Sequence, residues 1–244
     1  MVNADLSGKL ILITGAARRI GRLLALACAQ AGANIIIHHG HSPVEAETLK
    51  KAINQLGSAA EVVQLDLNDI SHVSALIQKS MAIGQIYALV NSAAIFSPLS
   101  VETTSLEHWE RHLHINLTAP FLLSQAFAKQ LPETETAHIV NILDWRALRP
   151  SADHFPYTIS KAALAALTRS MAVAFAPNIC VNGLALGAIL PPSDRKVNPD
   201  LLAPVPAGRW AKNGELESAI LFLLTQTGYI TGEIIHVDGG RHLI

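Results

Sequence analysis

The chain has 244 residues, of which 50% are hydrophobic and 15% are charged, and its formal net charge is -1. This composition excludes an intrinsically disordered chain and a polycationic nucleic-acid-binding surface, and two cysteines are too few for a disulfide framework. No apolar run approaches the ~20 residues of a membrane-spanning helix. The first residues do not resemble a signal peptide, so we expect a cytoplasmic protein that contacts neither membranes nor nucleic acid.

Short runs rich in Ile, Val and Leu alternate with longer helical segments along the whole chain. The predicted strands are Lys9–Thr14, Asn34–His38, Glu61–Leu65, Tyr87–Val90, His138–Leu143, Ile179–Gly183 and Glu233–Val237. The predicted helices are Ile20–Gly32, Pro43–Gly57, Ile70–Ala82, Ser105–Gln130, Tyr157–Phe175 and Gly214–Thr225. The strands show little alternation of polar and apolar residues, which is typical of strands covered on both faces. The pattern predicts one α/β domain over residues 1–244, with a parallel sheet wrapped by helices.

One segment interrupts this rhythm. Residues Leu190–Arg209 contain five of the twelve prolines and show no clear period. A long irregular stretch inside a compact domain is often a lid or a binding loop. We therefore expect this segment to border the substrate.

A glycine-containing turn, Thr14–Gly21, joins the first strand to the first helix. Such a turn points backbone N–H groups and the positive end of the helix at an anion. Gly15 permits the tight turn, and Gly21 lets the helix pack closely on the strand. An ordinary strand-to-helix turn without a ligand is the alternative, because Arg19 stands where a further glycine is expected.

The second predicted strand ends in His38-His39-Gly40-His41-Ser42, without a carboxylate. NAD-binding sites usually place Asp or Glu there to hold the ribose 2′-hydroxyl. Histidines, a serine and the nearby Arg18 and Arg19 would instead accept a 2′-phosphate, which favours NADP(H). A solvated histidine-rich loop is the alternative, and a metal site is disfavoured because no Cys, Asp or Glu completes a ligand set.

Two further segments follow the third and fourth strands. Asp66 is placed to accept a hydrogen bond from an adenine amino group, or to cap the next helix. Asn91-Ser92-Ala93-Ala94 consists of small residues that let an adenosine or ribose lie against the backbone, although close packing alone would also explain them.

Tyr157 and Lys161 lie four residues apart at the start of an apolar helix, so they share one helix face. A free phenol has a pKa of about 10, and a neighbouring ammonium is expected to lower the pKa of Tyr157 toward the working range. A chance pairing is the alternative, but the pair follows the fifth strand, at the sheet edge where open α/β sheets bind ligands.

Three other residues are candidates for the same crevice. Asp144 ends the fifth strand and would orient the phenol or accept from a substrate N–H group. Asn116 would open its predicted helix locally and carry a proton-relay water. Phe96 would stack on a flat substrate, or fill the core.

Together these motifs resemble the short-chain dehydrogenase/reductase family. The resemblance covers nearly the whole chain and rests on Thr14–Gly21, Asp66, Asn91–Ala94, Asn116, Tyr157 with Lys161, Val181-Asn182-Gly183, and Ile230-Thr231-Gly232 with Val237-Asp238-Gly239-Gly240. It implies a doubly wound Rossmann sheet of seven strands in the order 3-2-1-4-5-6-7. It also implies a homotetramer built on the helices Ser105–Gln130 and Tyr157–Phe175.

Departures from the family pattern narrow the resemblance. Arg19 replaces a glycine and Asp144 replaces a serine, as in pteridine reductases and the related dihydromonapterin or dihydrofolate reductases. In that subgroup the arginine reaches the cofactor phosphates and the pterin, and a phenylalanine at the position of Phe96 stacks on the pterin. Other positions differ from the subgroup: Ala94 replaces a serine, His41 an arginine for the 2′-phosphate, and Leu186 a proline.

These considerations define the predicted site. The expected catalytic residues are Tyr157, Lys161, Asp144 and Asn116. The expected residues for NADP(H) are Gly15, Arg18, Arg19, Ile20, Gly21, His38, His39, His41, Ser42, Asp66, Leu67, Asn91, Ser92, Ala93, Tyr157, Lys161, Gly187 and Ile189. The expected residues for a pterin or folate substrate are Arg19, Phe96, Asp144, Tyr157 and Leu190.

The leading hypothesis is an NADPH-dependent reductase of a pterin C=N bond. A carbonyl reductase acting on a 3-oxoacyl or ketone substrate is the first alternative, although it would lack the serine that normally polarises the carbonyl. A catalytically idle NADP(H)-binding regulator is the second, and the intact Tyr157–Lys161 pair argues against it.

Overall fold

A single seven-stranded sheet forms the centre of the computed structural model, which describes residues 4–150, 152–192 and 201–244. The strands are β1 (Leu10–Ile13), β2 (Asn34–His39), β3 (Ala60–Gln64), β4 (Ile86–Asn91), β5 (Ala137–Asp144), β6 (Ile179–Leu186) and β7 (Ile234–Val237). Their order is β3-β2-β1-β4-β5-β6-β7, and all six neighbouring pairs are parallel. The predicted strand order is thus confirmed, and the order reverses between β1 and β4, where such sheets bind ligands.

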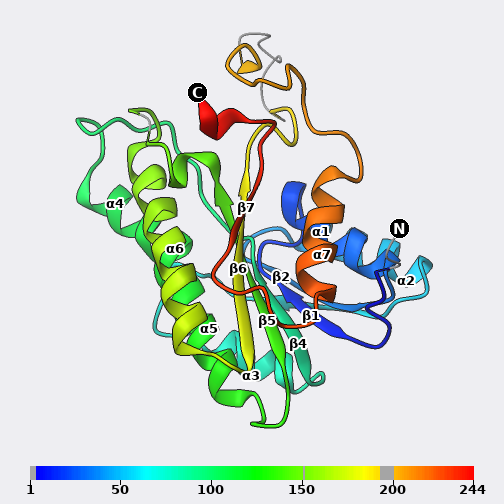
Figure 1. Ribbon diagram of the computed structural model, residues 1–244. Coiled ribbons are helices and arrows are strands. Elements are labelled where there is room, and N and C mark those ends of the chain that lie inside the picture. The colour runs from blue at the N-terminus through cyan, green and yellow to red at the C-terminus, as the bar shows by residue number, and fades with distance from the viewer. Residues whose placement is uncertain (1–3, 151, 193–200) are drawn as a thin grey trace.

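Helices cover both faces of the sheet (Figure 1). They are α1 (Arg19–Gln30), α2 (Pro43–Gln55), α3 (Ala75–Met81), α4 (Leu106–Leu113), α5 (Ala119–Gln130), α6 (Phe155–Ala174) and α7 (Glu215–Thr225). One apolar cluster packs α1, α2 and α7 against one face, and a second packs α3, α5 and α6 against the other. Because both faces are covered, every residue of β6 is buried, as are the first seven residues of β5.

Two predicted helices differ from the observed ones. The segment predicted as helix from Ile70 becomes regular only at Ala75, because Asp66 and Asp69 bind Asn68 N and Ser71 Oγ in local turns before it. The long helix predicted over Ser105–Gln130 is divided into α4 and α5 by a π-helical turn at His114–Thr118. That turn contains Asn116, so the predicted local opening of the helix at this residue is confirmed.

Residues 193–200 of the irregular segment Leu190–Arg209 lie outside the part of the chain that the structure describes. Its second part is held by the C-terminal segment: Arg241 Nη1 donates to Pro204 O over 2.7 Å, and Ala207 N donates to Gly239 O over 3.0 Å. Among the described residues, no helix is both long and apolar enough to cross a bilayer.

Candidate active site

The phenol of Tyr157 meets the carboxylate of Asp144 at the carboxyl end of β5. Tyr157 Oη donates to Asp144 Oδ2 over 3.1 Å. Asp144 is the last residue of β5, and Tyr157 lies in the first turn of α6, which packs against β5 and β6. Tyr157 is only 7% exposed, so the hydrogen bond lies in a largely dry environment. The sequence prediction that Asp144 orients Tyr157 agrees with this geometry.

The pKa of Tyr157 is raised well above its usual value, mainly by burial and then by the Asp144 carboxylate that accepts its hydrogen bond. The expectation that Lys161 lowers the pKa of the phenol is therefore wrong for the protein without ligand. The pKa rises because a buried, negatively charged phenolate beside the Asp144 carboxylate is unfavourable. Tyr157 accordingly remains protonated at neutral pH, which suits a proton donor.

Lys161 is 2% exposed, and its Nζ donates to Ile142 O over 2.6 Å. Nζ lies 5.8 Å from the centre of the Tyr157 ring. Burial lowers the pKa of Lys161 to about 8, and the Asp144 carboxylate partly opposes this shift. A buried ammonium close to the phenol is well placed to act on a ligand that reaches both residues.

Asn116 is fully buried and uses its side chain to hold the segment after β4. Its Oδ1 accepts from Ile95 N over 2.9 Å, and its Nδ2 donates to Ile95 O over 3.1 Å and to Ser160 Oγ over 3.0 Å. The π-helical turn aims this amide away from the helix ladder, toward β4 and α6. Asn116 thereby fixes the position of Ile95 and, with it, of the neighbouring Phe96.

Phe96 forms an exposed aromatic wall beside the phenol. It is 51% exposed, which excludes the alternative that it fills the core. His154 stacks on one face of its ring with centres 3.8 Å apart and planes within 5°, and Tyr157 contacts it edge-on at 4.6 Å. Because His154 already covers one face, the accessible area lies on the remainder of the ring, where a flat molecule can stack.

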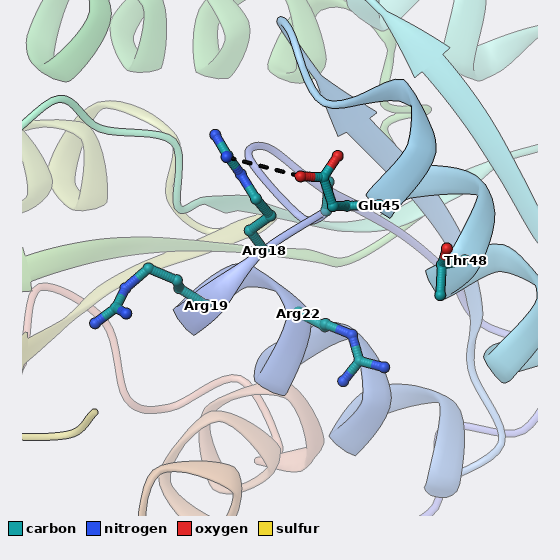
Figure 2. Close-up of a pocket in the computed structure, with 6 residues that line it drawn as sticks. Arg18, Arg19, Arg22, Glu45 and Thr48 are labelled. Carbon is teal, nitrogen blue, oxygen red and sulfur yellow. Dashed lines mark ion pairs between the residues drawn. The ribbon is translucent and has the colours of Figure 1, made fainter. Parts of the chain in front are cut away.

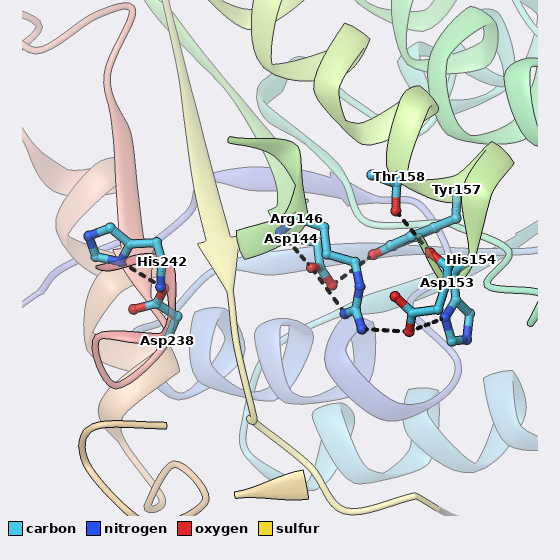
Figure 3. A network of polar contacts seen from close by, with 8 residues as sticks. All are labelled: Asp144, Arg146, Asp153, His154, Tyr157, Thr158, Asp238 and His242. Carbon is cyan, nitrogen blue, oxygen red and sulfur yellow. Dashed lines mark hydrogen bonds and ion pairs between the residues drawn. The ribbon is translucent and has the colours of Figure 1, made fainter. Parts of the chain in front are cut away.

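The sequence analysis did not identify Arg146, Asp153 and His154, which form a chain of polar contacts that begins at Asp144 (Figure 3). Arg146 pairs with Asp144 Oδ1 at 3.6 Å through Nη1 and with Asp153 Oδ2 at 3.1 Å through Nη2. His154 Nδ1 lies 2.9 Å from Asp153 Oδ2. No periodic signal marks these residues, and only their closeness in sequence to Asp144 and Tyr157 could have drawn attention to them.

The glycine-containing turn is packed too tightly for side chains at two positions. A Cβ on Gly15 would approach Ala93 Cα to 2.8 Å, and one on Gly21 would collide with the Gly15 carbonyl. Thr14 Oγ1 accepts from Ser92 N at 3.0 Å and from Ala93 N at 3.1 Å, which binds the ends of β1 and β4 together. The backbone therefore forms a close cradle at the switch point of the sheet.

This cradle fits the phosphates of a dinucleotide. Helix α1 begins at Arg19 without a side-chain cap and without an acidic residue in its first turn. Its first amide groups have no partner inside the helix, and its positive end is not neutralised by a carboxylate. Arg18 and Arg19 add two cations at the same place, so the residues present suit an anionic group.

Three of the residues predicted to hold a 2′-phosphate are buried: His38, His39 and Ser42. His38 Nδ1 accepts from Gly15 N at 3.2 Å and its Nε2 lies 2.9 Å from Leu65 O, so both ring nitrogens are engaged. His39 Nδ1 accepts from Ser42 N at 3.3 Å. Both ring nitrogens of His38 are thus engaged within the protein, which corrects its predicted phosphate contact. The phosphate contacts of His39, His41 and Ser42 stay predictions.

A pocket of about 460 Å³ lies beside this turn and is lined by three arginines (Figure 2). It is lined by Ala17, Arg18, Arg19, Arg22, Glu45 and Thr48. Arg18 Nη1 and Glu45 Oε1 are 3.8 Å apart, and both side chains are exposed. The sequence reading did not include Arg22 or Glu45, which the packing of α1 beside α2 brings to the pocket.

The remaining predicted cofactor residues lie along the same edge. Asp66 Oδ1 accepts from Asn68 N at 2.9 Å in a local turn, while Oδ2 lies 3.9 Å from the exposed His41. Asp66 does not cap the next helix, because α3 begins only at Ala75. Asn91 is buried, and its Oδ1 has no partner among the described residues. Of the other predicted cofactor residues, Leu67 and Ile189 are buried, and Ile20 and Gly187 are partly buried.

Arg19 connects the turn to the irregular segment. Its Nη2 donates to Pro191 O at 3.0 Å and lies 3.5 Å from Leu190 O. Its backbone φ of +50° is in the left-handed region, where glycine is favoured. The structure thus brings the predicted substrate residues Arg19 and Leu190 together.

Comparison with known proteins agrees with this architecture. The family model described as enoyl-(acyl carrier protein) reductase matches residues 15–242. The chain is 32% identical over 243 residues to a 3-oxoacyl-[acyl-carrier-protein] reductase of Aquifex aeolicus, covering 96% of this chain and 98% of the relative.

Two solved structures also resemble this chain. One is FolM alternative dihydrofolate reductase 1 from Brucella canis complexed with NADP, with TM-score 0.91, 34% identity and coverage of 99% of this chain and 96% of that one. The other is a gluconate 5-dehydrogenase from Burkholderia cenocepacia in complex with NADP and tartrate, with TM-score 0.90, 31% identity and coverage of 99% and 98%.

Proposed function

Because this chain belongs to the short-chain dehydrogenase/reductase family, we propose that it is an NADPH-dependent reductase of a C=N bond in a pterin or folate. Membership of the family makes it an NAD(P)-dependent oxidoreductase, and the cofactor that we assign is NADP(H). The proposed reaction converts a dihydropterin or dihydrofolate to the tetrahydro form.

The hydrogen bond between Tyr157 and Asp144 carries this proposal. Reduction of a ketone places negative charge on oxygen, and a carboxylate at this position would oppose that charge. Reduction of a C=N bond proceeds through protonation of nitrogen, which makes the substrate positive, and the same carboxylate would stabilise it. Asp144 is 18% exposed, so its charge is only partly screened by water.

The acid in this scheme is Tyr157. The reduced nicotinamide supplies a hydride when the cofactor is bound. Tyr157 Oη holds a proton that burial and the Asp144 carboxylate prevent from leaving to water, and this proton is available to a substrate nitrogen. Lys161, held by Ile142 O, supplies positive charge near the phenol and would support the phenolate that forms when the proton is given up.

Flat heteroaromatic substrates suit the walls of the crevice. Phe96 offers an exposed ring backed by His154, and stacking on it would orient a bicyclic substrate beside Tyr157. Arg19, which donates to Pro191 O, would place a cation at the opposite side. The Brucella canis structure, named an alternative dihydrofolate reductase, supports this substrate class.

Binding of the NADP(H) 2′-phosphate is assigned to the arginine pocket. Arg18 and Arg22 line it beside the glycine-containing turn, while His38 and His39 are buried beneath. No carboxylate replaces these histidines at the end of β2 to bind a ribose 2′-hydroxyl, although Glu45 from α2 enters the pocket. NADPH is therefore the expected reductant.

A carbonyl reductase is the second candidate, favoured by the name of the Aquifex aeolicus relative, which is a 3-oxoacyl reductase. For that activity, the negative charge that develops on the ketone oxygen would have to form beside the Asp144 carboxylate, which opposes it. A homotetramer is expected in either case, because α5 and α6 leave apolar side chains such as Phe121 and Val173 exposed, the latter by 82%.

NADPH oxidation measured with dihydropterins, dihydrofolate, acetoacetyl thioesters and quinones tests the proposal. Turnover of the dihydropterins or dihydrofolate in preference to the ketones and quinones would support it. Turnover of acetoacetyl thioesters alone would establish the carbonyl reductase. Tight NADPH binding without turnover of any compound would instead indicate a regulator.

A further inference from the structure

The side chain of Asp144 is only 18% exposed. A carboxylate that is largely shielded from water is costly to bury unless a cation or hydrogen-bond donors pair with it. The Nζ of Lys161 is directed to Ile142 O at 2.6 Å. The ion-pair partner that the structure gives Asp144 is Arg146, with Nη1 3.6 Å from Oδ1.

The backbone N–H and the guanidinium of Arg146 both contact the same carboxylate oxygen of Asp144. Its backbone N donates to Asp144 Oδ1 at 2.9 Å, because a short 3₁₀ turn, Trp145–Ala147, begins directly after β5 and Asp144 caps it. The guanidinium approaches Oδ1 from the side chain. Oδ2 is thereby left for the Tyr157 hydroxyl. The two oxygens of Asp144 thus have separate partners, which fixes the rotation of the carboxylate.

Other contacts hold the guanidinium in place. Arg146 is 17% exposed on its side chain, and its Nη2 donates to Asp153 Oδ2 at 3.1 Å. Its guanidinium carbon lies 4.6 Å from the centre of the Trp145 ring and 5.7 Å from that of Phe96. Arg241 from the C-terminal segment contacts the same Trp145 ring at 4.6 Å. A cation restrained on several sides loses less entropy on pairing than a free surface arginine does.

We propose that Arg146 is a positioning residue that keeps the Asp144 carboxylate ionised and directed at Tyr157 Oη. This inference rests on the proposed function for its catalytic meaning, since an ionised Asp144 is what favours a cationic substrate nitrogen. The effect of Arg146 on the ionisation of Asp144 does not depend on which substrate the protein uses. The charged and titratable groups of the segments near Asp144 are Tyr157 and Lys161 from α6, Asp153 and His154 from the segment before it, Arg146 and Arg149 from the segment after β5, and Arg241. Of these, Arg146 and Tyr157 contact the Asp144 carboxylate directly.

The experiment measures the ionisation of Asp144 directly. Protein labelled with ¹³C at the aspartate carboxyl carbons is titrated by NMR, and Asp144→Asn identifies the signal. Arg146→Met should raise the midpoint of Asp144 by about one pH unit or more, because a neighbouring cation is removed. Arg146→Lys, which keeps the charge, should leave it within about 0.5 units of wild type. Arg149→Met, an exposed arginine of the same segment, is the matched control and should leave it unchanged.

Kinetics then give the functional consequence. With a dihydropterin, Arg146→Met should lower kcat/KM about tenfold or more and move the acid limb of its pH profile upward by the same amount as the NMR midpoint. The dissociation constant of NADPH should stay within about twofold. Should the methionine variant not fold, Arg146→Gln provides the same neutral change.

Failure of this inference can be told apart from failure of the proposed function. An Asp144 midpoint that is unchanged in both neutral variants would overturn the role of Arg146, whatever the substrate. An Asp144 midpoint that is shifted in the neutral variants, together with a wild-type protein that does not reduce dihydropterins, would uphold Arg146 and reject the proposed substrate.

Discussion

Tyr157 and Asp144 share one hydrogen bond, 3.1 Å long, between a phenol that is 7% exposed and a carboxylate at the end of β5. Burial and this contact both raise the pKa of the phenol. Tyr157 is therefore protonated before substrate binds and can act as an acid. The direction favoured by this arrangement is reduction, because oxidation would need a phenolate as base.

Replacing Tyr157 by Phe removes the proton donor and leaves the ring. We expect kcat with a dihydropterin to fall about 10²- to 10⁴-fold, which is the usual contribution of a positioned acid. The dissociation constant of NADPH, followed by its fluorescence, should change by less than about threefold. Full turnover by the variant would show that another group supplies the proton.

The buried imidazole of His38 makes stability depend on pH. Burial lowers the pKa of His38 to about 4 from its usual 6.5. The unfolded chain therefore binds a proton at higher pH than the folded chain, so this contribution is complete above pH 6.5 and is lost as the pH falls toward 4. The shift corresponds to a loss on the order of 3 kcal/mol.

Denaturant unfolding at pH 7.5 and pH 5 measures this effect. His38→Gln can keep one donor and one acceptor and cannot take up a proton, so its stability should fall less than that of wild type between the two pH values. Equal losses in the two proteins would mean that His38 is not the group responsible.

Glu45 competes with a 2′-phosphate for Arg18, because the two side chains are 3.8 Å apart at the rim of the arginine pocket. Exposed pairs contribute only about 0.2–1 kcal/mol, so Glu45→Gln should tighten NADPH binding by no more than about fivefold. NADH binding should not change. Arg18→Gln is the opposing variant and should weaken NADPH alone. The assignment of the phosphate to this pocket is wrong if both variants affect NADH as much as NADPH.

Arg19 has a positive φ of +50°, which a side chain rarely adopts. Arg19→Gly relieves this conformation and removes the contact to Pro191 O, so the free energy of unfolding should stay within about 1 kcal/mol of wild type. The KM for a dihydropterin should rise severalfold, since the substrate would lose a cation. A thermal scan and steady-state kinetics measure the two effects separately. A large loss of stability with unchanged KM would make Arg19 purely structural.

Much of the fold follows from local pattern. Strands such as β6 are continuous apolar runs, and their alternation with helices specifies a parallel sheet whose carboxyl ends share one edge. That topology brings Asp144 and Tyr157 together at this edge, and even the opening of the helix at Asn116 could be predicted. The resemblance to pteridine reductases predicted that Phe96 stacks on the substrate, but not its edge-on contact with the ring of Tyr157.

Other features depend on tertiary contacts that no local pattern encodes. His38 and His39 point to opposite faces of the sheet, and both are buried because helices and loops cover both faces at the end of β2. The link from Arg146 to Asp153 requires the segment after β5 to fold back on the start of α6. Burial also reversed the expected effect on the Tyr157 phenol, because its environment, rather than its spacing from Lys161, decides the pKa.

The most direct test of the central claim compares wild type with Asp144→Ser, using NADPH and two substrates, a dihydropterin and an acetoacetyl thioester. Removal of the carboxylate should lower kcat/KM for the dihydropterin at least about tenfold while leaving that for the thioester unchanged or raised, because the charge at Asp144 favours a protonated nitrogen and opposes an alkoxide. A wild-type enzyme that reduces the thioester in preference to the dihydropterin, and loses that activity in Asp144→Ser, would contradict the account.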